Sequence, residues 1–171
     1  MKNKIKIIIS WIVVALIVVA IFTLSSQDSK KSASVSDGFI NNTIGSVNNG
    51  ELLENLENKY TYDVLSGFIR NLGHLFEYTV LGFFTYNAIY LSVKKRKLIK
   101  FIFSIIFVVI IASLDELYQG LSDRVASYKD VGIDTIGGIC GIIGMMFCFF
   151  VIKLIKQEFF KNNKIKLVIN K

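Results

Sequence analysis

The sequence predicts an all-α integral membrane bundle of about four transmembrane helices, with both termini in the cytoplasm. Of its 171 residues, 53% are apolar, a larger share than in ordinary soluble domains. Four apolar runs have about the 20-residue length that crosses a bilayer. Lysines and arginines gather beside the ends of these runs, in a pattern that selects one orientation.

The first apolar run follows three lysines at the N-terminus, as the core of a secretory signal does. It is longer than the core of a cleavable signal, so we predict a retained membrane anchor, with cleavage as the alternative. The four predicted spans cover residues 5–24, 67–93, 98–117 and 131–155.

Four regions follow from these spans. The polar region between the first two spans has one candidate amphipathic helix, "ELLENLENKY". The predicted regions are an N-terminal anchor (1–24), an extracytoplasmic polar segment (25–66), a three-helix transmembrane core (67–155) and a basic cytoplasmic tail (156–171).

Positive residues set the predicted orientation because they resist translocation across the membrane. They concentrate at the N-terminus, in "KKRKLIK" between the second and third spans, and in the tail after the fourth. All three places therefore belong on the cytoplasmic side of the membrane. The net charge of +7 is consistent with basic residues that lie beside the anionic lipids of the inner leaflet. We predict no nucleic-acid partner.

The second span carries ionisable residues that a helix surrounded by lipid would not tolerate. Arg70, His74 and Glu77 are spaced by four and three residues, so they lie along one stripe of a helix. In the predicted orientation the stripe begins at the outer face and descends into the membrane. A lone carboxylate at the depth of Glu77 is costly, so we expect it to be protonated, paired or exposed to water.

The third and fourth spans bring further polar residues to the same outer end. Gly137 and Gly141 form a small-xxx-small pair that should let the fourth helix approach the second, with Arg70 or His74 within reach of Asp134. We therefore predict an outward-facing polar pocket. Its ligand-binding residues are Arg70, His74, Glu77, Asp115, Glu116, Gln119, Arg124, Asp130 and Asp134.

Several of these residues also have an ordinary structural interpretation. Asp130 is equally consistent with a helix cap, and Arg70 with a side chain that reaches the membrane surface. For His74, a hydrogen bond to Glu77 or to a backbone carbonyl is the simpler expectation. We predict no cofactor, with a divalent metal ion held by His74 and carboxylates as the alternative.

The same residues belong to stretches that resemble the motifs of a known protein family. The chain resembles the VanZ-like family of small bacterial membrane proteins over about residues 24–144, in "LSSQ", "RNLGHLFEYTVLG", "DELYQGLSDR" and "DVGIDTIGGICG". The resemblance implies a multi-span protein of the cytoplasmic membrane. Its implied motif residues are Ser26, Gln27, Arg70, His74, Glu77, Tyr78, Asp115, Glu116, Gln119, Arg124, Asp130, Asp134 and Gly138.

Two departures from the family pattern concern the third motif. Tyr118 stands where the family often has histidine, and Ser122 and Asp123 stand where it often has proline and glycine before Arg124. The turn that carries Arg124 is therefore less rigid than in the family pattern.

The family is named for a member that confers low-level resistance to teicoplanin, a glycopeptide antibiotic. The resemblance therefore implies lowered glycopeptide sensitivity, through a pocket that binds a lipid-linked or cell-wall-related ligand. An alternative is an intramembrane enzyme in which His74 acts with Glu77 or Asp134 as acid and base on a lipid headgroup. A third hypothesis is structural, in which the charges only lock the helices together.

Overall fold

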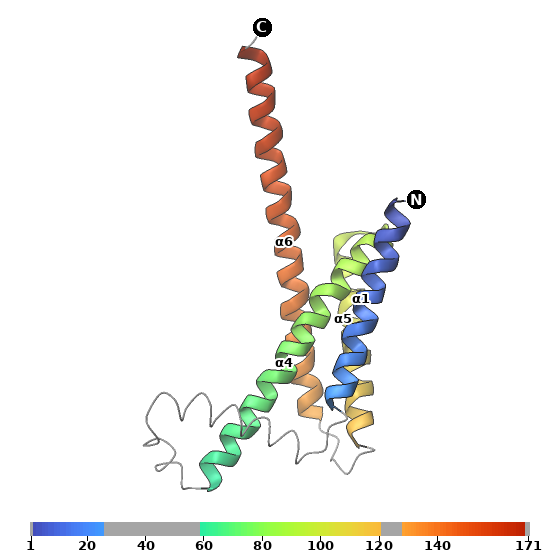
Figure 1. Ribbon diagram of the computed structural model, residues 1–171, viewed down its shortest axis with the longest axis vertical. Helices are drawn as coiled ribbons and strands as arrows, with labels where there is room; N and C mark the ends of the chain where they lie inside the picture. Colours follow the sequence, from blue (N-terminus) through green and yellow to red (C-terminus); the bar gives the residue numbers. More distant parts are fainter. Residues whose placement is uncertain (1, 26–58, 121–127, 170–171) are drawn as a thin grey trace.

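The computed structural model describes residues 2–25, 59–120 and 128–169, which form four α-helices and no strand (Figure 1). The predicted all-α class is therefore confirmed. Most of the polar segment predicted over residues 25–66 lies outside the described residues, as does most of "ELLENLENKY". The helices are α1 (Lys2–Ser25), α4 (Lys59–Ser92), α5 (Lys97–Gly120) and α6 (Tyr128–Ile169).

Three of the helices are long and apolar enough to cross a membrane, over Asn3–Ser25, Lys97–Gly120 and Tyr128–Phe159. α4 is longer than α1 and α5, at 34 residues, but its polar residues keep it below the same hydropathy level. α4 contacts each of the other three helices, and a helix enclosed by protein need not be apolar on every side. The predicted span over residues 67–93 stays a prediction.

The outer surface of the helix bundle, which faces away from its core, is apolar. Leu16 on α1 and Phe147 on α6 are each 64% exposed, whereas a soluble protein rarely exposes a continuous apolar surface of this kind. The buried stripe of α5 is polar at both ends and apolar in the middle, and it consists of Lys100, Ser104, Val108, Ala112, Asp115, Glu116 and Gln119. Apolar groups outside and polar groups inside are what a lipid surrounding favours.

α4 crosses the bundle and makes its most extensive contact with α6 (Figure 1). Within the described ranges, α1 and α6 do not touch each other. The N- and C-terminal ends of the chain lie toward the same end of the bundle, and the start of α4 lies at the opposite end (Figure 1). This arrangement agrees with the prediction that both termini lie on one side of the membrane.

Glycines make the contact between α4 and α6 possible. A Cβ atom on Gly137 would overlap the carbonyl group of Leu75, and one on Gly141 would overlap the carbonyl group of Thr79. The backbones of α4 and α6 therefore touch over one helical turn, because the side chains that would separate them are missing. The predicted role of this glycine pair in close packing is confirmed.

α6 continues beyond the apolar run from which its span was predicted. The run ends at residue 155, but the helix extends to Ile169 and projects past the other helices (Figure 1). Residues 145–169 contain no glycine or proline to interrupt it. The predicted tail from residue 156 therefore begins as a continuation of the helix.

Candidate functional site

Asp115 is the centre of a buried polar cluster near the end of α5. Its side chain is fully buried, and its Oδ2 atom accepts hydrogen bonds from Ser25 Oγ at 2.9 Å and from Gln119 Nε2 at 3.0 Å. The hydroxyl of Tyr78 donates a longer bond, at 3.4 Å. One carboxylate oxygen thus joins the end of α1, the middle of α4 and the last turn of α5.

His74 on α4 and Asp134 on α6 lie beside Asp115. Each of the three residues offers one nitrogen or carboxylate oxygen, and these atoms all lie within 4.8 Å of one another. Asp134 is 1% exposed and His74 is partly buried. Three helices therefore bring an imidazole and two carboxylates together, as the sequence predicted for His74 and Asp134.

The close packing of α4 and α6 explains this meeting. Leu75 and Thr79, whose carbonyl groups face the glycines of α6, directly follow His74 and Tyr78 in the chain. Asp134 precedes Gly137 by almost one helical turn. The glycine contact therefore fixes the distance between the polar turns of the two helices.

Several carboxylate oxygens in this region have no hydrogen-bond partner among the described residues. They are buried, and they belong to Asp115 (Oδ1), Asp134 (Oδ1) and Glu77 (Oε2). Leaving a buried polar atom unsatisfied costs about 1–3 kcal/mol, and more for a charged group. We refer below to the polar cluster, which comprises Ser25, His74, Glu77, Tyr78, Asp115, Glu116, Gln119 and Asp134.

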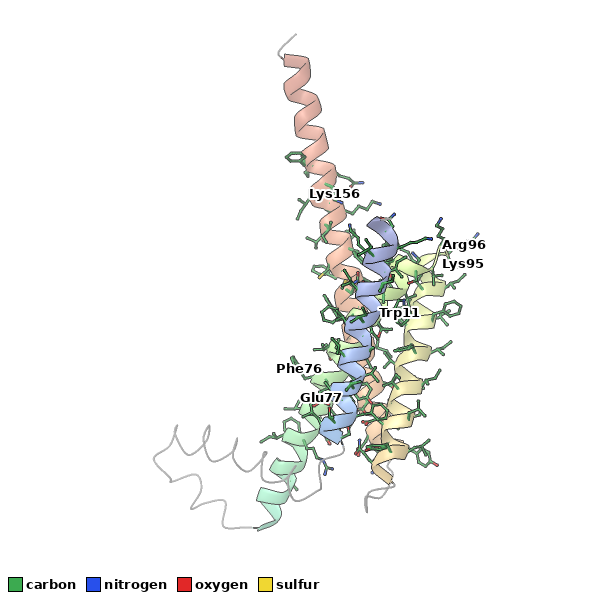
Figure 2. All side chains as sticks on the ribbon, turned by 45° about the vertical axis from the view of Figure 1, so that its right-hand side comes forward. Trp11, Phe76, Glu77, Lys95, Arg96 and Lys156 are labelled. Carbon is green, nitrogen blue, oxygen red and sulfur yellow. The ribbon has the colours of Figure 1, made fainter. Side chains whose placement is uncertain are left out.

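The polar cluster lies at the end of the bundle opposite to the predicted cytoplasmic charges. Figure 2 places Glu77 in the lower part of the bundle, away from Lys95 and Arg96 in the α4–α5 connection and from Lys156 on α6. Glu116 is buried, at 6% exposure, beside Asp115 in the chain. The polar cluster is therefore separated along the bundle axis from the positive residues that set the predicted orientation (Figure 2).

Two predicted site residues that the structure describes are not counted in this cluster. Arg70 is exposed and forms no ion pair with the described residues, and Asp130 is partly buried in the first turn of α6. An acidic group in that position interacts favourably with the helix dipole. Arg124 lies outside the described residues, together with Ser26 and Gln27.

Two hydrogen-bond donors to Asp115 were not among the predicted ligand-binding residues. Tyr78 follows His74 by four residues, so the helical period that selected His74 also places Tyr78 on the same stripe. Ser25 carries a weaker signal. It is the last residue of α1, and only its place beside the polar residues after the first span indicates a position at the mouth of the bundle.

Fold and cluster together define a helical membrane protein with acidic groups and one histidine buried at one end of its bundle. The model of the VanZ/LLP1 family matches residues 10–152. The chain belongs to this family, as its motifs indicated, and every residue of the polar cluster lies within the matched range. Comparison with curated proteins and with solved structures gives no match.

Proposed function

We propose that this VanZ-family membrane protein uses the polar cluster to bind a lipid-linked or cell-wall-related ligand from the outer side of a bacterial cytoplasmic membrane. The observation that carries the proposal is the set of buried carboxylate oxygens that have no hydrogen-bond partner within the part of the chain that the structure describes, on Glu77, Asp115 and Asp134. A protein that needed these groups only for packing would satisfy them internally. Their free lone pairs are the acceptor capacity that a ligand would fill.

The proposed ligand has both donor groups and an anionic group. Hydroxyl, amide or ammonium donors would pair with the carboxylates of the polar cluster. Arg70, which precedes His74 by one turn and is exposed, would contact a phosphate or carboxylate through forked hydrogen bonds. Arg124 is proposed for the same task. Headgroups of membrane-bound envelope intermediates combine these two kinds of group.

The proposed consequence is lower sensitivity to glycopeptide antibiotics such as teicoplanin, a property that the family suggests. The test is expression of the wild-type chain, Arg70→Ala and Asp134→Asn in a sensitive host. Inhibitory teicoplanin concentration and the amount of protein in the membrane are measured together. We expect the wild type to raise the concentration, and both variants to lose this effect at normal abundance.

Each part of the proposal can fail separately in that experiment. An unchanged inhibitory concentration with the wild type would contradict the antibiotic part. Variants that lose function only in proportion to their abundance would contradict ligand binding and favour the structural hypothesis. Glu158→Gln serves as a matched control, because Glu158 is an exposed carboxylate on α6 outside the cluster.

The position of His74 beside two carboxylates also favours a second candidate function, intramembrane acid–base catalysis. An imidazole next to Asp115 and Asp134 has the groups required for proton transfer to or from a lipid headgroup. Purified protein incubated with polyprenyl phosphates and with phospholipids would form product only if this candidate is correct. His74→Ala is the control that would abolish such product formation.

A further inference from the structure

The side chains of His74, Asp115 and Asp134 lie close enough together to bind a single ion within the polar cluster. The three residues come from α4, α5 and α6, and their candidate ligand atoms lie within 4.8 Å of one another. Around a tetrahedral ion with bonds of about 2.0–2.2 Å, ligand atoms are about 3.4 Å apart. Small side-chain rotations would therefore bring the group onto a shared ion.

The unpartnered oxygens are an independent sign of a missing ligand. Asp115 and Asp134 are 0% and 1% exposed, and each has one buried oxygen with no hydrogen-bond partner in residues 2–25, 59–120 and 128–169. No described lysine or arginine forms an ion pair with either residue. Two carboxylates this close in a bundle of low dielectric cannot both stay ionised unless a positive charge lies nearby, and a cation would supply it.

The hydrogen bonds to Asp115 hold it in the manner of a metal ligand. Ser25 and Gln119 both donate to Oδ2, which leaves Oδ1 available. Outer hydrogen bonds of this kind orient ligating carboxylates and imidazoles in metalloproteins. The ligands also stand on three closely packed helices, because glycines of α6 contact the α4 backbone and, at Gly138, the Val108 side chain of α5, so the group is held by rigid elements.

We propose that His74, Asp115 and Asp134 bind a divalent transition-metal ion of the Zn²⁺ or Mn²⁺ class, with at least one coordination position left open. One imidazole nitrogen and two carboxylate oxygens form a mixed donor set. Mg²⁺ and Ca²⁺ prefer oxygen ligands alone, whereas imidazole favours the transition ions. An open position would accept a phosphate or carboxylate oxygen of the ligand proposed above.

This inference concerns the cluster on which the proposed function rests, but its test is independent of antibiotic sensitivity. The full chain is purified in detergent through a tag without histidine, treated with a chelator, and dialysed against Zn²⁺, Mn²⁺ or Mg²⁺. Metal content per chain is then measured by elemental analysis. We expect about one equivalent of Zn²⁺ or Mn²⁺, and none of Mg²⁺.

The variants decide whether the ion occupies this position. His74→Ala and Asp134→Asn should retain less than about a tenth of the bound metal, whereas Glu158→Gln should bind as the wild type does. Co²⁺ serves as a spectroscopic probe. The chain has one histidine, so loss of the visible absorption bands of bound Co²⁺ in His74→Ala would report the loss of an imidazole ligand.

Two results of the metal analysis would overturn the inference. One is wild-type protein that holds no stoichiometric Zn²⁺ or Mn²⁺ after dialysis, and the other is an unchanged metal content in both cluster variants. If the variants do not fold, thermal unfolding of the wild type still decides, because Zn²⁺ or Mn²⁺ bound to the native state must raise its melting temperature. An unchanged melting temperature would contradict the site. If metal binds but teicoplanin sensitivity does not change, only the proposed function fails.

Discussion

Two ends of the same bundle bury charged groups in opposite ways. At the end near the termini, Lys100 is 9% exposed, and its Nζ atom donates a hydrogen bond of 3.1 Å to the carbonyl oxygen of Tyr90. The same atom lies 3.9 Å from the centre of the Tyr90 ring. At the other end, Asp115 and Asp134 are more deeply buried, and each keeps an oxygen that no described residue hydrogen-bonds.

The difference separates a structural charge from a functional candidate. Tyr90 is in the last turn of α4, where unpaired carbonyl groups and the helix dipole favour a positive group. Lys100 therefore closes the α4–α5 connection, and its charge is satisfied by its own neighbours. Glu77, Asp115 and Asp134 by contrast each keep a buried oxygen without a hydrogen-bond partner among the described residues, so unfilled hydrogen-bonding capacity, and not burial alone, marks the candidate site.

The largest effect is expected from filling the contact between α4 and α6 beside the polar cluster. A Cβ atom on Gly141 would overlap the α4 backbone at Thr79, so Gly141→Ala must push the helices apart. We expect a loss of about 3 kcal/mol in unfolding free energy, the upper part of the range for overpacking. Denaturant unfolding in detergent micelles measures it.

Gly144→Ala is the matched control for this prediction. Its Cβ atom would lie 3.7 Å from Cδ2 of Phe83, an ordinary contact distance. It should change stability by less than about 1 kcal/mol, because alanine is also the better helix former. Equal destabilisation by the two alanines would refute the backbone contact as the element that positions the cluster.

The next effect concerns the satisfied charge. Lys100→Met keeps much of the aliphatic chain but removes the hydrogen bond to the carbonyl oxygen of Tyr90 and the contact with its ring. We expect a loss of about 2 kcal/mol, typical of a hydrogen bond made by a charged group. Thermal unfolding would reveal it as a lower melting temperature. Stability equal to the wild type would mean that this lysine only marks the cytoplasmic side.

A smaller effect is expected when one donor to Asp115 is removed. Ser25→Ala takes away the 2.9 Å bond to Oδ2 but leaves the bonds from Gln119 and Tyr78. Stability should fall by about 1 kcal/mol, and affinity for the proposed metal by about tenfold, as for outer hydrogen bonds at metal sites. Titration with Zn²⁺ measures the second effect.

Ser113→Ala is the control for that measurement. The Ser113 hydroxyl also lies on α5, but it donates to the Val109 carbonyl group of its own helix. It should leave the metal affinity unchanged. A similar loss of affinity in both variants would mean that hydroxyl groups act through helix stability and not through the orientation of Asp115.

The smallest effect is expected at the contact between α1 and α4 near the termini. Trp11 Nε1 donates a 3.0 Å hydrogen bond to Ser92 Oγ, and Figure 2 shows Trp11 on α1 toward the end where the chain begins. Trp11→Phe should cost about 0.5–1.5 kcal/mol, without any change in metal content. If Ser92→Ala adds further destabilisation to Trp11→Phe, the two side chains do not act as a pair.

The sequence predicted much of this fold because lipid imposes simple rules. Long apolar runs located the helices, and the spacing from His74 to Glu77 placed them on one stripe. Gly137 and Gly141 predicted close packing because small residues allow helix backbones to touch. Each of these inferences depends on the sequence of a single helix. The glycine pair predicts close packing whichever helix lies against it.

The sequence could not predict features that depend on where helices end relative to one another. Arg70 shares the stripe of His74 but is exposed, and the position of neighbouring helices that decides this exposure cannot be read from the spacing. Ser25 reaches Asp115 because α1 ends at the level of the polar cluster. Lys100 was interpreted only as a marker of orientation, since its burial against Tyr90 depends on the turn between α4 and α5.

The most direct test of the central claim compares Asp134→Asn with Lys100→Met in the same cells. Membrane abundance and the inhibitory teicoplanin concentration are measured for both variants. The account predicts that Asp134→Asn keeps wild-type abundance and loses the effect on teicoplanin, whereas Lys100→Met loses both in proportion. Proportional loss in Asp134→Asn as well would contradict the claim that the carboxylates of Glu77, Asp115 and Asp134 form a functional site.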